Sequence, residues 1–350
     1  MNAIGEWFGS GTCNKRLSLI RGFWRGQGRS IVTITPERES YREAKSDEDV
    51  VARAMSAIRM QAKLPGWNLP QFMADFGTGP ESYWGCRLSV ASDGQHVRTE
   101  PAARTMTEAL SLTPLPIADP IQNARRTVCI FDRLQAELES NEIWLRIPSI
   151  HGALGMAVTI VDQEELLVAM LEKPSEVRLF FERLTDFLIV YVQYLRSASG
   201  CRDCGMIWPY TFLPSQFGIS LVEDHLPLVS PELYREFAIP YLTRLANSFG
   251  GLQIHCCGSW GPHARSFLHL GDTLRAVEFH YPFTTIEELN CLSATAVYIP
   301  YICLDQQDVF ENRSQYFQFL LENTSQSHRY WFAFPEDSEE ARWFAQEHGF

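Results

Sequence analysis

The residues with the clearest chemical meaning are His255 and Cys257, within Gly-Leu-Gln-Ile-His-Cys-Cys-Gly at 251–258. Residues 251–256 read as a strand, and alternate residues of a strand face the same side. We therefore expect both side chains to point into one pocket, with Cys256 turned into its wall. An imidazole and a thiolate suit zinc, which needs a third protein ligand. The alternative interpretation is a buried histidine beside two buried cysteines.

A resemblance to a known family adds to this motif. The chain reads Ser-Pro-Glu-Leu-Tyr-Arg-Glu-Phe at 230–237, Pro-Tyr-Leu at 240–242 and Gly-Ala-Leu-Gly-Met-Ala at 152–157. Together with His-Cys-Cys-Gly, these stretches resemble the uroporphyrinogen decarboxylase superfamily over about residues 70–350. The closer similarity is to the branch of the methylcobamide:thiol methyltransferases. The resemblance implies a (β/α)8 barrel, zinc, a corrinoid (methylcobamide) co-substrate, either bound as a cofactor or carried by a partner protein, and a small thiol as methyl acceptor.

In that branch, the His-x-Cys-Gly motif supplies two zinc ligands and a cysteine at the end of the last strand supplies the third. Zinc holds the thiol substrate as a thiolate, which attacks the methyl group on the corrinoid cobalt. Here residues 331–336 contain no cysteine. Cys303 is the favoured substitute, because it completes a set of two cysteines and one histidine. His280 and Glu278, at another expected strand end, are the alternatives.

Four further polar residues lie at or near expected strand ends and are candidates for contact with a substrate: Asp75, His151, Tyr210 and Asp224. His151 can contact a substrate carboxylate or act as a general acid or base. Asp224 can orient substrate or support a metal ligand, or it is an exposed loop acid. We expect Asp75 either to line a cavity or to cap a helix or turn. We expect Tyr210 either to donate a hydrogen bond at the rim of the cavity or to form part of an aromatic wall. No residue is assigned to corrinoid binding.

The elements that must position these residues alternate between strands and helices. Eight strands are expected, at 71–76, 143–150, 205–211, 218–222, 251–256, 276–280, 296–303 and 329–334. Apolar periodicity predicts helices at Pro174–Ser197 and Pro231–Phe249, the second capped by Ser230 and kinked at Pro240. This alternation predicts a (β/α)8 barrel, with an open doubly wound sheet as the alternative. In a barrel, functional residues lie at the carboxyl ends of the strands.

The first 70 residues are less regular. One helix is expected there, from Asp47 to Ala62, with Ser46 as its N-cap. The predicted organisation is therefore an irregular N-terminal extension, residues 1–70, that packs on a barrel domain, residues 71–350.

Composition narrows the class of protein. The 350 residues carry 42 acidic and 30 basic side chains, a net charge of −12, which argues against nucleic acid as a partner. The most apolar run, 187–195, is too short to span a membrane, and no signal peptide is apparent, so a cytoplasmic location is expected. Nine irregularly spaced cysteines argue for reduced thiols rather than disulfides.

These observations favour a zinc-dependent methyltransferase that moves a methyl group between a corrinoid and a thiol-type acceptor. One alternative is a metal-free barrel that binds a corrinoid or tetrapyrrole as an accessory protein. Another is a decarboxylase-type lyase that works through Asp75, His151 and Asp224. A homodimer is compatible with the sequence, but no surface patch identifies one.

Overall fold

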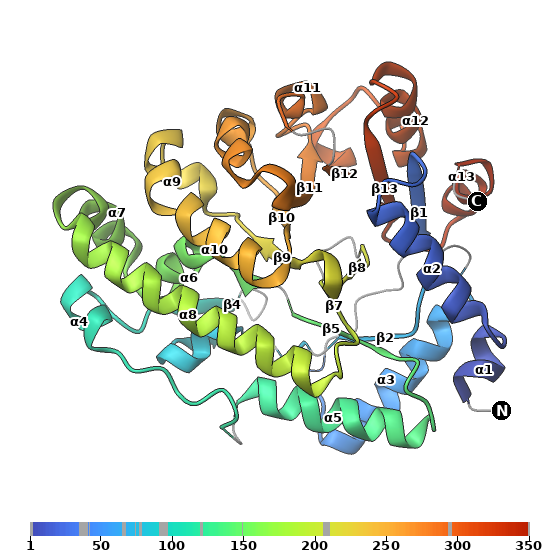
Figure 1. Ribbon diagram of the computed structural model, residues 1–350, viewed down its shortest axis with the longest axis horizontal. Helices are drawn as coiled ribbons and strands as arrows, with labels where there is room; N and C mark the ends of the chain where they lie inside the picture. The colour runs from blue at the N-terminus through green and yellow to red at the C-terminus, as the bar shows by residue number, and fades with distance from the viewer. Residues whose placement is uncertain are drawn as a thin grey trace.

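The computed structural model describes residues 3–34, 41, 43–64, 68–73, 75–76, 79–90, 97–119, 122–148, 150–205, 211–292 and 296–348. Strands lie at the centre of the molecule and helices surround them (Figure 1). The helices are α1 Ala3–Phe8, α2 Thr12–Trp24, α3 Asp47–Gln61, α4 Met106–Ser111, α5 Asn123–Glu137, α6 Ala153–Ile160, α7 Gln163–Glu172, α8 Pro174–Ala198, α9 Pro231–Phe237, α10 Ile239–Phe249, α11 Ile286–Leu289, α12 Arg313–Asn323 and α13 Glu339–His348. No helix in the described ranges has both the length and the hydropathy needed to cross a membrane.

The main sheet has seven strands, and every neighbouring pair is parallel. Its order is β1-β13-β12-β11-β10-β9-β6. The strands are β1 Ser30–Ile34, β6 Ile150–His151, β9 Ile219–Val222, β10 Leu252–Cys256, β11 Leu274–Tyr281, β12 Val297–Ile302 and β13 Arg329–Phe334. Because the strands are parallel, their carboxyl ends meet at one edge of the sheet, where ligands bind in α/β folds.

A second sheet has the order β2-β5-β7-β8, and a separate antiparallel pair joins β3 Arg87–Val90 to β4 Val97–Glu100. The strands of the second sheet are β2 Gln71–Met73, β5 Trp144–Arg146, β7 Asp203–Gly205 and β8 Leu213–Pro214. The strand expected at 143–150 is thus divided between two sheets, as β5 and β6. The predicted α/β class, with a mainly parallel sheet, is confirmed. The strand pairings among the described residues form the two larger sheets and the β3–β4 pair rather than one closed ring.

The helices predicted from apolar periodicity are close to those observed. α8 buries one stripe of large side chains, among them Phe180, Phe181 and Leu188. The region predicted as one kinked helix is α9 followed by α10, with the break at Ala238, because Pro240 lies in the first turn of α10 and has no N–H to donate. The Ser230 hydroxyl caps α9 by accepting from Leu233 N–H.

The N-terminal segment contributes a strand that the sequence analysis did not identify. β1 pairs in parallel with β13, although about 300 residues separate them in the chain (Figure 1). The preceding helix α2 is anchored by Trp24, whose indole N–H donates to the Phe212 carbonyl at 2.8 Å and whose ring lies 5.7 Å from that of Trp331. The segment therefore packs into the common core. A domain boundary near residue 70 stays a prediction.

Candidate functional site

Three neighbouring strands bring the candidate residues together. In the register of the main sheet, His255 of β10 lies opposite Val222 of β9 on one side and Glu278 of β11 on the other. Asp224 follows β9 by two residues, Cys257 follows β10 directly, and His280 lies near the end of β11. Parallel pairing therefore places chemistry-bearing side chains from three elements at one edge.

The first cluster consists of Asp224, His255 and Cys257, whose potential ligand atoms lie within 4.8 Å of one another. Nε2 of His255 is 3.3 Å from Oδ1 of Asp224, and the same oxygen accepts the Cys257 backbone N–H at 2.9 Å. His255 is buried, Cys256 is fully buried and Cys257 is exposed. The side chains of His255 and Cys257, which were expected to point to the same side, do lie close together, and Asp224 joins them.

The second cluster consists of His255, Glu278 and His280. Oε2 of Glu278 faces Nδ1 of His255, and Oε1 is 2.8 Å from Nε2 of His280. Glu278 is completely buried, and the two imidazole rings pack edge to face at 5.3 Å. The two clusters therefore share His255 but lie on opposite sides of its ring, Asp224 at Nε2 and Glu278 at Nδ1.

Cys303 belongs to neither of these two clusters. Its Sγ lies 3.9 Å from Nδ1 of His280, and the residue is partly exposed. The favoured third ligand of the sequence analysis is thus placed beside His280, an alternative ligand, rather than beside Cys257. The contacts form one chain, in the order Asp224, His255, Glu278, His280 and Cys303.

Burial sets the protonation of the site in the absence of a metal. It lowers the pKa of His255, against the opposing influence of Asp224, and lowers the pKa of His280 to about 4. Although Cys257 is exposed, partial desolvation of its sulfur, together with Asp224, raises the pKa of the thiol to about 12. For Asp224, burial acts to raise the pKa, but hydrogen bonds with His255 and Cys257 and the attraction of His255 outweigh it, so the pKa is well below its usual range. Burial thus favours the neutral form of both imidazoles, in which one ring nitrogen keeps its lone pair.

The buried carboxyl group of Glu223 lies next to the site, directly before Asp224 in the chain. Glu223 is 1% exposed; its two oxygens accept the Gly152 N–H at 3.1 Å and the Tyr234 hydroxyl at 2.9 Å. Burial raises the pKa of Glu223 to about 7. Its backbone N–H donates to the His255 carbonyl at 2.8 Å. The sequence analysis did not select Glu223; the signal was an acid directly after a buried strand and directly before Asp224.

The remaining candidates are placed differently. His151 ends β6, and its ring lies 5.3 Å from that of His225, a histidine that the sequence analysis did not select. Burial lowers the pKa of both, that of His225 to about 4. The Asp75 carbonyl accepts the Tyr41 N–H at 2.8 Å, and Asp75 is not a member of either cluster. Tyr210 lies outside the described residues.

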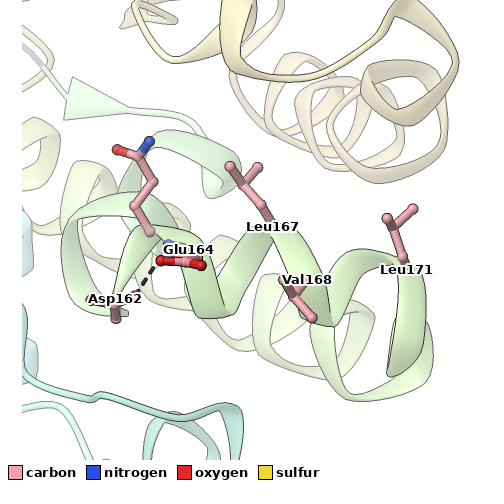
Figure 2. Close-up of a pocket in the computed structure, with 6 residues that line it drawn as sticks. Asp162, Glu164, Leu167, Val168 and Leu171 are labelled. Carbon is pink, nitrogen blue, oxygen red and sulfur yellow. Dashed lines mark hydrogen bonds between the residues drawn. The ribbon is translucent and has the colours of Figure 1, made fainter.

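Apart from a hollow of about 650 Å³ at α9 and α10, lined among others by Glu236, Pro240 and His269, two hollows lie elsewhere on the described surface. One, of about 370 Å³, is lined by Thr99, Pro101, Val158, Thr159, Val161, Asp162, Gln163 and His225. The other, of about 530 Å³, runs along α7 between Asp162 and Leu171 (Figure 2). In the second hollow, Asp162 accepts the Glu164 N–H at 3.1 Å and so caps the helix, while Val168 and Leu171 are exposed. The acid there has a structural role, and the described residues that line these hollows form no metal-capable cluster.

Comparison with known proteins shows the fold. No family model and no curated protein matches the sequence. Among solved structures, a methyltransferase from Methanosarcina mazei matches with a TM-score of 0.64 and 11% identity, over 95% of this chain and 96% of that one. A proposed vitamin-B12-independent methionine synthase from Listeria monocytogenes matches with a TM-score of 0.46 and 12% identity, over 85% and 83%. The protein therefore has a fold like that of the Methanosarcina methyltransferase.

Proposed function

We propose that the protein is a zinc-dependent methyltransferase that moves a methyl group between a corrinoid and a thiol-type acceptor. The observation that carries the proposal is the cluster of Asp224, His255 and Cys257 at the carboxyl ends of adjacent parallel strands. The likeness in fold to a methyltransferase supports it, as does the resemblance of the 230–258 region to corrinoid-linked enzymes.

The proposed zinc ligands are Nε2 of His255, Sγ of Cys257 and a carboxylate oxygen of Asp224. Nitrogen, sulfur and oxygen donors within 4.8 Å of one another fit this metal. Metal-bound histidines usually donate their other ring N–H to a carboxylate, and Glu278 faces Nδ1 of His255 in that way. Asp224 thus replaces Cys303 as the preferred third ligand, and His280 and Glu278 support the site from the far side of the ring.

The zinc, when bound, would lower the pKa of a thiol substrate so that its sulfur is nucleophilic at neutral pH. The chain's own residues prepare this position. With the metal bound, Glu278 would accept a hydrogen bond from His255 Nδ1–H, so that the Nε2 lone pair is free for the metal. The exposed Cys257 lies at the solvent side, where a small thiol can enter. The Cys257 N–H, bound to Asp224, fixes the loop that follows β10.

The finer architecture is also a proposal. We infer that the two sheets belong to one (β/α)8-type barrel. β5 and β6 are separated by only residues 147–149, and Ile147 N–H donates to the Cys204 carbonyl of β7 at 3.1 Å. Only three residues thus connect β5 of the second sheet with β6 of the main sheet. Closure would place the clusters at the mouth of the barrel, where barrel enzymes act.

The proposal also names partners and a location. A corrinoid protein presents the methyl group, and the nine cysteines suit the reducing cytoplasm.

Metal analysis of the purified protein tests the proposal. We expect about one zinc per chain, lost in His255→Ala, Cys257→Ala and Asp224→Ala and retained in Cys303→Ala. His263→Phe, which changes a buried histidine outside both clusters, is the matched control. Loss of the methylcobalamin absorbance on addition of a small thiol then reports methyl transfer. Absence of zinc after purification with added metal and reductant would overturn the proposal in favour of a metal-free binding barrel.

A further inference from the structure

The loop that follows β12 holds an apolar side chain out in solvent, at the carboxyl edge of the main sheet. Val309, in the segment 303–312, is 63% exposed. The side chain of Gln307 fixes the turn: its oxygen accepts the N–H of Val309 at 2.8 Å and the N–H of Phe310 at 2.9 Å, and its amide donates to the Phe310 carbonyl at 2.9 Å. The segment begins at Cys303, the last member of the contact chain at the candidate site. Val309 is thus held in place on a loop that starts at that site.

Aromatic rings support this loop and widen the apolar surface. The ring of Phe310 lies 5.6 Å from that of Tyr281, 5.1 Å from that of Tyr316 and 5.4 Å from that of Phe319. Phe310 is partly exposed, and Phe319, on α12, is 38% exposed. We call Val309, Phe310 and Phe319 the apolar patch. Apolar side chains that stay grouped at a surface mark interaction sites, because their contact with water costs free energy.

Exposed acids border the apolar patch, and no basic residue of the loop balances them. Asp305, Asp308 and Glu311 are all exposed, and the segment 303–312 contains no lysine, arginine or histidine. None of the three acids forms an ion pair with another described residue. The next basic residue, Arg313, has its guanidinium over an aromatic ring. The loop therefore presents an apolar centre with a negatively charged border.

We propose that the apolar patch is the centre of a docking surface for a partner protein whose contacting face has an apolar pocket surrounded by lysine and arginine. An apolar centre with a polar border is the usual anatomy of a protein interface. Opposite charges on the two faces speed their encounter and fix their orientation. The identity of this partner as the protein that carries the methyl group rests on the proposed function, since the segment 303–312 begins at the candidate site.

Charge argues against a second copy of this chain as the occupant. In a symmetric dimer the same patch of both subunits meets, so the acids of one copy would face the same acids of the other. The net charge of −12 adds to this repulsion. An anionic lipid surface or a nucleic acid would also meet charge of its own sign. The border of the patch therefore selects a basic protein surface.

Binding of a model peptide tests the proposal. The probe is a fluorescent amphipathic helix of leucine and lysine, which offers an apolar face between basic edges, and fluorescence polarisation measures its affinity. Val309→Asp, and separately Asp305→Asn combined with Asp308→Asn, should each weaken binding at least about tenfold, because central apolar anchors and complementary charges dominate such contacts. Affinity should also fall as ionic strength rises from about 0.01 M to about 0.15 M, which screens exposed charges.

Matched changes on α7 are the controls. Leu171→Asp changes another exposed apolar residue, Glu164→Gln combined with Glu172→Gln removes two exposed acids, and neither should alter the affinity. No binding of the peptide, or equal binding by all variants, would overturn the proposal. So would a dimer, seen by light scattering, that dissociates in Val309→Asp, since the occupant would then be a second copy.

Zinc content separates this proposal from the proposed function. Val309→Asp should keep the zinc content of the unmodified protein, because Val309 is in neither metal-capable cluster. Peptide binding without zinc would overturn the methyltransferase proposal and leave the docking surface. Zinc without peptide binding would do the reverse.

Discussion

Glu278 faces Nδ1 of His255 from the neighbouring strand β11, and this contact leaves Nε2 of the same ring directed at Asp224. One fully buried carboxylate thus orients the histidine at the centre of the candidate zinc site. Its other oxygen contacts His280.

Replacement of this carboxylate should weaken metal binding without removing a ligand. In Glu278→Gln, the amide no longer favours one protonated form of His255, and we expect zinc affinity to fall by about 10–100-fold. Competition with a chromophoric chelator measures the affinity. Glu287→Gln, a change to an exposed acid on α11, should have no effect. Equal affinities for the protein and Glu278→Gln would show that Glu278 does not support the metal ligand.

A side chain at position 152 should disrupt the wall behind the site. An added Cβ on Gly152 would lie 2.2 Å from Oε1 of Glu223, an oxygen that is held by the Gly152 N–H itself. We therefore expect Gly152→Ala to lower the free energy of unfolding by about 1–3 kcal/mol, measured by urea denaturation. Gly258→Ala is the matched control, since its nearest contact would be an ordinary 3.5 Å. Equal stability of the two variants would contradict the expected clash.

The ion pair between Arg196 and Asp203 should matter more than a surface pair of the same type. The Asp203 side chain is 0% exposed and the Arg196 side chain 18% exposed, with 3.0 Å between them. Removal of the acid in Asp203→Ala leaves a mostly buried guanidinium without its carboxylate, at an expected cost of about 3 kcal/mol in unfolding free energy. Asp337→Ala, which breaks the more exposed pair with Arg342, should cost under about 1 kcal/mol. Similar losses in both variants would argue against the role of burial.

Stability should depend on pH through the buried His263. Burial lowers the pKa of His263 below its usual 6.5; Glu232 acts to raise this pKa and Arg235 to lower it further. The unfolded chain therefore binds a proton at this residue below about pH 6.5 while the folded protein stays neutral, so acid favours unfolding. His263→Phe should lose less unfolding free energy than the unmodified protein between pH 7.5 and 5.5. Equal slopes for the two proteins would show that His263 is not held neutral by the fold.

Local features were predictable because they depend on neighbours in the chain. The alternation of residues in a strand was enough to place His255 and Cys257 on one side and Cys256 in the wall. The division between α9 and α10 follows from Pro240, which cannot donate the hydrogen bond that a continuous helix needs. The α/β class follows from the alternation of strands and helices.

Only the tertiary structure decided which distant residues meet. Asp224 rather than Cys303 lies against His255, because the register of β9 on β10 brings the residues after those two strands together. The same kind of long-range pairing places Glu278 between two histidines and adds β1 to the sheet beside β13. Strand register depends on packing across the whole core. Residue types and spacing therefore predicted the kind of site, while the register of the parallel strands determined which side chains contact His255.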